Sequence, residues 1–477
     1  MRRLTVLRPA AAATLAALLL AGCTLAPRYE QPEPPIPAQW PHDATDQAVA
    51  ATPDWRGVLL DPQLQALVEQ ALANNRDLRL AALNVEAARA QFRIQRADRL
   101  PGLAATAEGR RQRLPSGVAG EAGVPATGGG VVEQYSAGLG LAAFEIDLFG
   151  RVRSLSDAAL AEFMATTHAR RGAELSLVSA VATAWLNERA ARERLALVEA
   201  ALVDWEESGR LAELRFQAGV GSALEQVETA TLVESARADA ADARRQARQA
   251  SNLLALLVGA PVDPATLPAA GPLEDAVLAD LPPGLPSDLV ARRPDILAAE
   301  QSLRAANASI GAARAAFFPR LSLTGFLGSA STEFSDLFES GTRTWLFQPQ
   351  LAVPIFQGGR NRANLDLAHV RREASVARYE LAIQEAFREV ADALAAREAF
   401  HDQAQALGRL ADAGIERESL VSLRFDAGVD SNLALLDARR SRYQAQQALL
   451  QARVAALSAN LDLYRALGGG WNHPDPP

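Results

Sequence analysis

Cys23 is the only cysteine in the 477-residue chain, and its thiol has the most specific chemical setting in the sequence. Three arginines precede an apolar run from Ala10 to Leu20, and a Leu-Ala-Gly tripeptide leads directly into the cysteine. This order is typical of a secretory signal whose apolar core is too short to span a membrane stably. The tripeptide with Cys23 resembles the bacterial lipobox, in which the cysteine receives a covalent lipid. Thr24, rather than an aspartate, follows the cysteine, and under the sorting rule of proteins with this motif that resemblance implies the outer membrane. The alternative is a chance cysteine near a cleavage site.

No other group of side chains has the spacing of a catalytic or metal site. The five histidines are scattered, and neither a nucleophile elbow nor a phosphate-binding loop is present in the sequence. Residues 1–22 carry three arginines and no acids, so the rest of the chain has 45 basic residues (48 − 3) against 56 acidic ones, a net charge of −11. That charge is unfavourable for binding nucleic acid. We therefore expect no enzyme, metal site or nucleic-acid partner, and no cofactor apart from the lipid on Cys23.

An eleven-residue stretch occurs twice. Leu214–Leu224 returns 209 residues later as Leu423–Leu433, with eight of the eleven residues identical. In each copy a helical pattern runs into Ala-Gly-Val and resumes after a serine, which can cap the next helix. Each copy predicts a tight turn between two helices, here called a tip, and the pair predicts an internal twofold repeat. The tips either only reverse an antiparallel bundle or form a shared docking surface.

The elements around the tips repeat as well. Asp77–Pro101 matches Asp295–Pro319 at an offset of 218 residues, and Gly150–Arg153 matches Gly359–Arg362 at an offset of 209. Helical periodicity continues from Gly150 to Gln217, about 100 Å if unbroken. After the second tip, apolar and aromatic residues recur every seven residues. This pattern predicts a supercoiled partner helix.

Between these helices the hydrophobic period changes from 3.6 to 2. Apolar and small residues alternate over Leu103–Arg110 and Tyr135–Ala143, and again over Leu321–Gly328 and Trp345–Ile355. Each pair of segments predicts a β-hairpin of two long strands. Pro349 weakens the prediction of the last strand, because proline has no N–H to donate.

The sequence therefore predicts six consecutive parts. They are a signal peptide (1–22), a lipid-anchored Pro-rich tether (23–60), a first structural repeat (61–259, β-hairpin 102–148, tip 217–222), a linker (260–287), a second repeat (288–468, β-hairpin 320–356, tip 426–431) and a tail (469–477). Prolines make the tether extended, which would let the body of the protein sit away from the lipid anchor. The Pro-rich linker is either a disordered connection or an ordered girdle around the helices.

The alternating strands fit the wall of a membrane barrel, because lipid offers no partner for an open sheet edge. Four strands cannot close a barrel, since the smallest single-chain barrels have about eight. Several copies of the chain would therefore share one barrel, with the long helices continuing as a tube below it. A soluble β-structure is the alternative.

The motifs of the mature chain resemble those of the TolC-like outer-membrane factors, and within them the OprM/NodT-type lipoprotein branch. The resemblance covers essentially the whole mature chain. It rests on the lipobox, the tether, both tips, Asp61-Pro62 with Leu64, Asn75-Arg76-Asp77-Leu78, Gly284–Leu289 with Arg292–Ile296, and Val353–Arg360. It implies a mainly α fold with a membrane β-barrel. In the implied homotrimer, four strands per chain form a 12-stranded β-barrel and long antiparallel helices form a 12-helix periplasmic α-barrel.

The same resemblance implies a function and partners. The protein would be the exit duct of a tripartite efflux system, lipid-anchored in the outer membrane and spanning it, with a large periplasmic extension. The duct would carry drugs or other small molecules from the periplasm to the outside. Its partners would be outer-membrane lipid, a periplasmic adaptor and an inner-membrane transporter of the RND type, and the transporter would select the cargo.

The resemblance also places a periplasmic gate at the second tip. Leu433 and Asp437 match the apolar and acidic constriction positions of OprM-like channels, and Arg440 matches a basic residue beside them. Three copies of Leu433 would form a ring that resists wetting, and three copies of Asp437 a ring that favours cations. The alternative is that Leu433 is an ordinary core residue of the heptad pattern and Asp437 a solvated flank.

The first tip departs from this pattern, with Thr231 in the position of Arg440. We therefore do not expect the two hairpins to be equivalent gate elements. Both tips keep Gly-Val-x-Ser, which in this family meets the helical hairpins of the adaptor. The residues predicted to form the docking surface are Gly219, Val220, Ser222, Gly428, Val429 and Ser431.

Other classes fit the sequence less well. A duct for type I protein secretion would have the same architecture. A periplasmic adaptor would need one helical hairpin flanked by compact β-domains, whereas this sequence predicts two hairpins. A structural coiled-coil lipoprotein would lack the alternating strands.

Overall fold

The computed structural model describes residues 24–37, 40, 53–114, 130–262 and 288–470. The predicted signal peptide, Cys23, most of the linker and most of the tail lie outside these residues. The chain divides into two compact units, and each unit draws on both halves of the sequence. Unit 1 comprises Met1–Pro32, Glu86–Ala165 and Glu300–Arg378, and unit 2 comprises Glu33–Val85, Thr166–Ala299 and Tyr379–Pro477.

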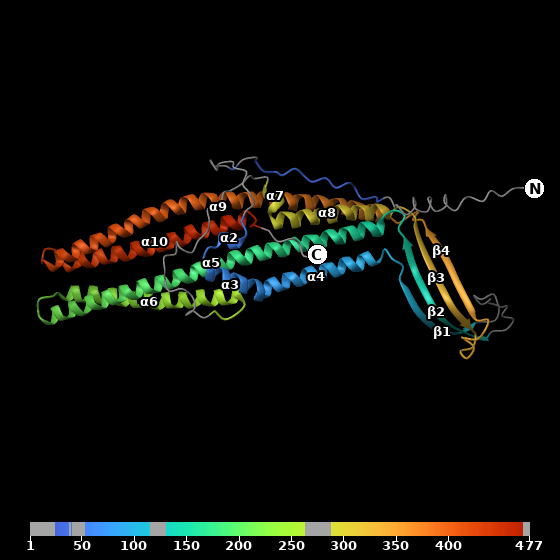
Figure 1. The fold of residues 1–477 in the computed structure, drawn as a ribbon, viewed down its shortest axis with the longest axis horizontal. Helices are drawn as coiled ribbons and strands as arrows, with labels where there is room; N and C mark the ends of the chain where they lie inside the picture. The colour runs from blue at the N-terminus through green and yellow to red at the C-terminus, as the bar shows by residue number, and fades with distance from the viewer. Residues whose placement is uncertain (1–23, 38–39, 41–52, 115–129, 263–287, 471–477) are drawn as a thin grey trace, which may run out of the picture. The chain divides into compact units, whose positions relative to one another are not determined.

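Unit 1 contains one antiparallel sheet of four strands in the order β1-β2-β3-β4 (Figure 1). The strands are β1 (Leu103–Leu114), β2 (Gly130–Ile146), β3 (Arg320–Ser331) and β4 (Arg343–Ala352). Strands β2 and β3 come from different halves of the chain and pair across Gly138 and Gly328. A Cβ atom added at Gly138 would lie 2.5 Å from the carbonyl oxygen of Leu327, so the two backbones approach too closely there for a side chain.

The four predicted strands are confirmed, with one correction to their extent. Strand β4 ends at Ala352, the partner of Arg320 at the start of β3, so Val353 and Ile355 lie beyond the ladder that was expected to include them. Pro349 lies within β4 opposite Leu323, so the ladder accommodates the proline that weakened the prediction of this strand.

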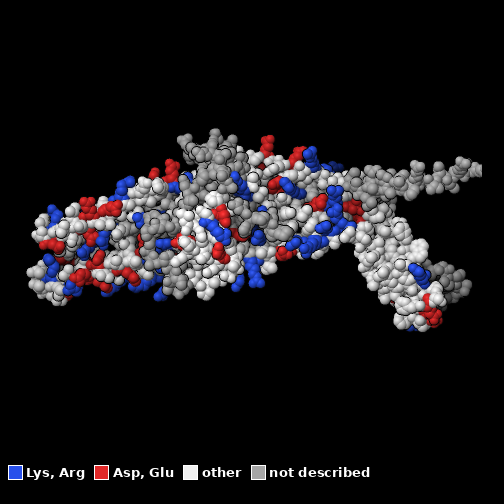
Figure 2. Space-filling model, in the orientation of Figure 1, with Lys and Arg blue, Asp and Glu red and all other residues white. Residues whose placement is uncertain are grey.

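The sheet carries exposed apolar side chains and few charges. Trp345 is 73% exposed, and Leu139, Leu327, Phe347 and Leu351 are exposed as well. In Figure 2 the visible face of the strands is mostly uncharged, with charged side chains gathered at one end. A soluble sheet of this kind would normally cover such a surface, so this surface requires an apolar environment.

Four long helices lead into and out of the two tips, and the helix predicted from Gly150 to Gln217 is confirmed. They are α5 (Arg151–Gln217) and α9 (Arg360–Asp426), each of 67 residues, and α6 (Ala223–Val258) and α10 (Asn432–Ala466), which follow the two tips. The shorter helices are α2 (Trp55–Val58), α3 (Pro62–Asn74), α4 (Arg76–Ala97), α7 (Asp288–Arg292) and α8 (Pro294–Ala315). No helix of the described segments has the length and hydropathy needed to cross a bilayer.

Two polar residues singled out by the sequence begin helices in unit 2. Asp61 caps α3 by accepting hydrogen bonds from the backbone N–H groups of Gln63 and Leu64. Asn75 accepts a bond from the N–H of Leu78 and donates one to the carbonyl of Leu257 at the end of α6. Asn75 therefore caps one helix and ties it to another.

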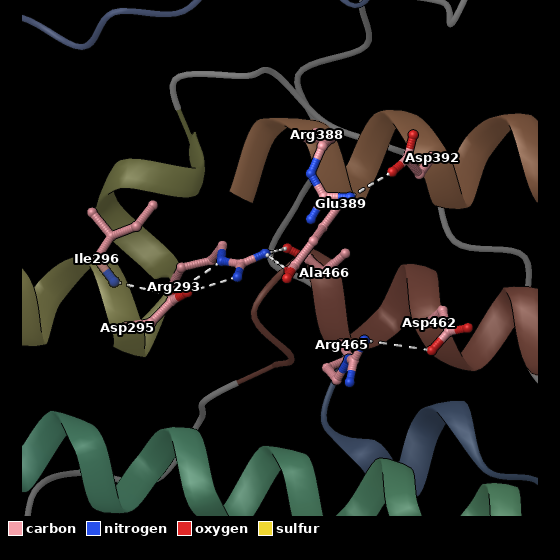
Figure 3. Close-up of polar contacts among 9 residues, drawn as sticks. All are labelled: Arg293, Asp295, Ile296, Arg388, Glu389, Asp392, Asp462, Arg465 and Ala466. Atoms are coloured by element: carbon pink, nitrogen blue, oxygen red, sulfur yellow. Dashed lines mark hydrogen bonds and ion pairs between the residues drawn. The ribbon is translucent and has the colours of Figure 1, made fainter. Parts of the chain in front are cut away.

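Arg293 joins three segments of unit 2 (Figure 3). Its guanidinium donates to both carboxylate oxygens of Asp295 (3.0 and 2.7 Å) and to the carbonyl of Ala466 at the end of α10 (2.9 Å), and it lies 2.8 Å from Glu389 of α9. The side chain is only 8% exposed. Burial works against the charge, but Asp295 and Glu389 outweigh it and raise the pKa of Arg293. This arginine holds α8, α9 and α10 together.

Candidate functional site

The two tips have the same backbone geometry. At the first, the N–H of Val220 bonds to the carbonyl of Arg215 and the N–H of Gly219 to that of Phe216. At the second, Val429 and Gly428 repeat both bonds with Arg424 and Phe425. This arrangement is the Schellman motif, which needs a left-handed residue after the helix, and Gly219 and Gly428 have φ angles of 75° and 73°. The repeated glycines thus terminate α5 and α9.

A serine begins the next helix at each tip. Ser222 Oγ accepts from the N–H of Glu225 at 3.1 Å, and Ser431 Oγ accepts from the N–H of Ala434 at 3.3 Å. The valine between the glycine and the serine packs against little: Val220 is 70% exposed and Val429 is 64% exposed. Both tips therefore present an apolar side chain and bare glycine backbone on a rigid turn.

Asp437 of α10 is the centre of an ion cluster behind the second tip. Its carboxylate accepts hydrogen bonds from Arg417 of α9 and Arg440 of α10, each at 2.8 Å. The bond from Arg417 is the largest influence on the pKa of Asp437 and lowers it; partial burial opposes the shift and Arg440 adds to it. The carboxylate is therefore ionised and shared between two arginines.

Leu433 lies one turn nearer the tip and is 63% exposed. Within the single chain, the alternative that Leu433 is an ordinary core residue of the heptad pattern is wrong. The helix presents Leu436, the next heptad position, to the core instead. Leu436 is buried in a cluster with Ala201, Trp205 and Ala236. The gate residues predicted from the sequence thus lie together on the surface of α10.

The two tips are linked to each other within the chain. Asn432, the first residue of α10, donates a 2.8 Å hydrogen bond to Glu225 in the first turn of α6. A groove of about 670 Å³ lies between the tips. The charged residues that line it are Arg215, Glu225, Glu228, Asp426 and Asp430.

A second set of ion pairs joins the hairpins farther from the tips. Glu418 of α9 is 14% exposed at its side chain and pairs with Arg439 and Arg442 of α10. The same two arginines reach α5, where Arg439 donates to Ser208 and Arg442 to Asp204. The second hairpin is therefore held to the first by arginines on α10.

The first tip lacks the cluster found at the second. Thr231 Oγ1 donates to the carbonyl of Val227 within its own helix, and Leu224 is exposed like Leu433. The expectation that the hairpins differ agrees with this local arrangement. Only the second combines an exposed leucine with a carboxylate held by two arginines.

The sequence interpretation missed Arg417. It lies ten residues before Ala427, and Asp437 lies ten residues after it. Arg424 and Asp430, which form a bidentate pair with distances of 2.8 and 2.9 Å, lie three residues to either side. Residues equidistant from the turn face each other across an antiparallel hairpin, so opposite charges at equal spacing were the available signal.

The described segments contain no cluster of His, Cys, Asp and Glu that could hold a metal ion. The carboxylate of Asp437 is neutralised by the guanidinium groups of Arg417 and Arg440. The ion pairs around Asp437 and Glu418 join α9 to α10.

The four-stranded sheet with exposed apolar side chains and the long helical hairpins define an outer-membrane channel component. The sequence profile described as "Outer membrane efflux protein" matches residues 67–260 and 285–469, and the chain belongs to this family. This is a family of transport proteins, not of enzymes, and the chain is an outer-membrane efflux channel protein.

Two curated relatives illustrate the similarity. The chain is 48% identical over 462 residues to the outer membrane protein OprJ of Pseudomonas aeruginosa, covering 96% of this chain and 95% of the relative. It is 46% identical to the toluene efflux pump outer membrane protein TtgC of Pseudomonas putida, covering 95% of this chain and 94% of TtgC. A solved structure, the open state of the Neisseria gonorrhoeae MtrE outer membrane channel, is 42% identical with a TM-score of 0.83, covering 94% of this chain and 98% of that one.

Proposed function

We propose that three copies of this chain form a gated exit duct of a tripartite efflux pump of the RND type. The observation that carries the proposal is the sheet of unit 1, whose outer strands β1 and β4 each pair on one side only among the described residues. Long, apolar, half-paired edges are unstable in water and in lipid alike. Three such sheets joined edge to edge would give twelve strands and a closed barrel.

The proposed gate lies at the second tips. Three copies of Leu433 would surround the axis of the duct and resist wetting, and three clusters of Asp437, Arg417 and Arg440 would lie one turn deeper. The distances within the cluster support a hairpin that moves as one body, because each carboxylate is satisfied by its own chain and joins α9 to α10. The gate would open when the α9–α10 hairpins move apart.

The proposed docking surface for a periplasmic adaptor consists of the six tip residues Gly219, Val220, Ser222, Gly428, Val429 and Ser431. The exposed valines support it, since apolar side chains on a rigid turn are presented without cost in conformational entropy. The proposed cargo is small and largely apolar. TtgC, named as a toluene efflux protein, supports small-molecule efflux over protein secretion.

We further propose that Cys23 carries a covalent lipid and anchors the mature chain in the outer membrane, and that the chain uses no other cofactor. The support is the sequence around Cys23, together with the absence of any other cysteine that could be modified. The twofold relation between residues 61–259 and 288–468 belongs to the same proposal. Helices α5 and α9 of equal length, each followed by an identical turn, support it.

Single-channel recording in planar bilayers tests the duct and its gate together. The parent should give small currents, and the double variant Asp437→Ala, Arg440→Ala much larger ones. The matched control is Glu207→Ala, Arg210→Ala, which removes an exposed ion pair of the same spacing from the first hairpin. Equal, sizeable currents in all three proteins would show that the pore exists but that Asp437 and Arg440 do not form its gate. Absence of current from a folded, SDS-resistant trimer would refute the channel.

A further inference from the structure

The segment that follows Cys23 lies along helix α8 in unit 1. The carbonyl of Leu25 accepts a hydrogen bond from Arg314 (3.2 Å), the carbonyl of Pro27 accepts one from Asn307 (2.8 Å), and the hydroxyl of Tyr29 donates to Glu300 (3.0 Å). Residues Thr24–Tyr29 are called the strap below. The α8 residues that contact it are called the track; they are Glu300, Arg304, Asn307, Gly311 and Arg314.

The spacing of the track is that of one face of a helix. Its members are four, three, four and three residues apart, so all five project from one stripe. The strap runs in the opposite direction to α8, since its first contact is with Arg314 and its last with Glu300. The strap is therefore held by side chains along nearly the whole length of the helix rather than at one point.

Gly311 shows that the strap is seated in a built site. A Cβ atom added there would lie 2.7 Å from the nitrogen and 2.8 Å from the Cα of Ala26, and 2.5 Å from the hydroxyl oxygen of Ser154 on α5. The strap backbone therefore rests on the α8 backbone at a position where only glycine fits. Any larger residue at 311 would push the strap or α5 away.

The end of the strap farthest from Cys23 is held by contacts of Tyr29 with Glu300 and Arg304. The guanidinium of Arg304 lies 4.8 Å from the ring centre of Tyr29 and pairs with Glu300 at 2.7 Å. Burial, followed by the charge of Glu300, raises the pKa of Tyr29 to about 12, so its hydroxyl remains a donor at any physiological pH. Glu300 and Asn307 are both buried beneath the strap.

The related helix of the other half provides an internal comparison. At the offset of 218 residues, α4 has Ala82, Glu86, Arg89, Arg93 and Arg96 where α8 has the track. Only the last residue is the same, and Arg93 occupies the position of Gly311. The track is thus absent from α4, and it is not a general requirement of this helix. It is a feature of the one copy that carries the strap.

We propose that the track is a registration site for the lipid anchor. This rests on the proposed lipidation of Cys23 and on the proposed membrane sheet. Only Thr24 separates Cys23 from Leu25 in the sequence. Leu25 is held by Arg314 in the last turn of α8, which ends at Ala315, five residues before β3. The acyl chains would therefore leave the protein where the helix gives way to the sheet.

The length of chain between Cys23 and Trp40 indicates how strongly the track restricts the position of the lipid. Trp40 stacks on Phe387 in unit 2 with ring centres 4.9 Å apart. If the chain were free from Cys23 as far as Trp40, its 17 residues would span up to about 56 Å. The track restricts the lipid to a far smaller volume and raises its effective concentration beside the sheet. The first residues of the predicted tether, Thr24–Tyr29, thus lie along α8.

Tryptic cleavage in the strap tests whether the track holds it. Arg28 is a trypsin site within the strap, and cleavage after it releases Cys23–Arg28 with any attached acyl chains. In the purified lipidated trimer this bond should resist trypsin. Gly311→Arg, which installs the residue found in α4, should be cleaved at least tenfold faster. Tyr29→Phe, which keeps the ring beside the cleaved bond and removes only the hydroxyl that donates to Glu300, should be cleaved faster too. Glu33→Ala, beyond the strap, should match the parent.

Trimer stability tests the role of the held lipid. Gly311→Arg and Tyr29→Phe should lower the temperature at which SDS-resistant trimers dissociate. Behind a signal peptide cleaved before residue 23, and with Cys23→Ser, the same substitutions should have no further effect, because no lipid remains to be positioned. If the strap only supports the fold, the substitutions should lower the dissociation temperature equally in the lipidated protein and in the Cys23→Ser protein.

The mass of the released peptide separates this proposal from the proposed function. A parent that carries acyl chains but is cleaved after Arg28 as fast as Gly311→Arg would overturn the registration site and leave lipidation intact. A parent without acyl chains would overturn both. If Gly311→Arg makes the strap accessible to trypsin but its trimers dissociate at the same temperature as the parent, the role assigned to the track is overturned.

Discussion

A guanidinium nitrogen of Arg417 lies 2.8 Å from a carboxylate oxygen of Asp437, across the antiparallel arms of the second hairpin. Arg440 holds the other carboxylate oxygen at the same distance. One acid and two arginines leave each cluster with a net charge of +1. The expectation that Asp437 by itself would make a cation-favouring ring therefore needs revision, because the ring it would form is neutralised by its own chain.

Removal of Arg417 should change ion selectivity. In Arg417→Ala each cluster becomes neutral, so cations should pass more readily, and the reversal potential under a salt gradient should shift toward that of the cation. The exposed ion pair itself stabilises the chain by only about 0–1 kcal/mol, so folding should be unaffected. Arg210→Ala on the first hairpin is the matched control. An unchanged reversal potential in Arg417→Ala would place the selective ring elsewhere.

The gate cluster should be insensitive to pH across the neutral range. Arg417 lowers the pKa of Asp437, so the stability that the ionised carboxylate contributes is present above the unfolded pKa of about 3.9 and is lost only as pH falls through the lower folded value. Conductance recorded from pH 8 to pH 5 should therefore stay constant and rise only in strong acid. A rise between pH 7 and pH 5 would contradict this assignment, since no carboxylate with a lowered pKa titrates there.

Charges introduced at the tips should separate docking from folding. Val220→Asp and Val429→Asp place a charge on side chains that are already exposed, so the free energy of unfolding should change by less than about 0.5 kcal/mol. Binding of the periplasmic adaptor, measured by co-purification and by export, should be lost. Val203→Asp, another exposed valine, in α5 and away from the tips, is the control. Normal adaptor binding by both tip variants would refute the docking surface.

Arg293 should be among the most sensitive positions of unit 2. Arg293→Met would leave Glu389 and the carbonyl of Ala466 without their donor, which should destabilise the helices by about 3 kcal/mol, the lower end of the range for a broken buried pair, because Glu389 is partly solvated. Arg293→Lys should recover only part of this, since an ammonium cannot form the forked contact with Asp295. Thermal unfolding followed by circular dichroism measures both.

Figure 3 supplies the control for Arg293. Arg388, next in sequence to Glu389, forms an exposed pair with Asp392, and both side chains are 66% exposed. Arg388→Met should change stability by less than about 1 kcal/mol. Equal effects at positions 293 and 388 would show that burial does not govern the contribution of these arginines.

The sequence by itself determined the elements. The change of hydrophobic period from 3.6 to 2 located four strands, and Gly219 and Gly428 marked the ends of two 67-residue helices, because only glycine readily adopts the left-handed backbone that such a turn needs. Local physics fixes these features, so they can be predicted without knowledge of distant contacts. The motifs along the chain also identified the family.

Only the tertiary structure decided which distant residues meet. The pairing of β2 with β3, the donation from Arg417 to Asp437 and the contact of Asn432 with Glu225 depend on how the chain returns on itself. The contact of the strap with Gly311 also depends on the tertiary structure, because the sequence around a glycine within a helix does not indicate which segment packs against it. Side-chain spacing defines the faces of helices and strands, whereas packing alone selects their partners.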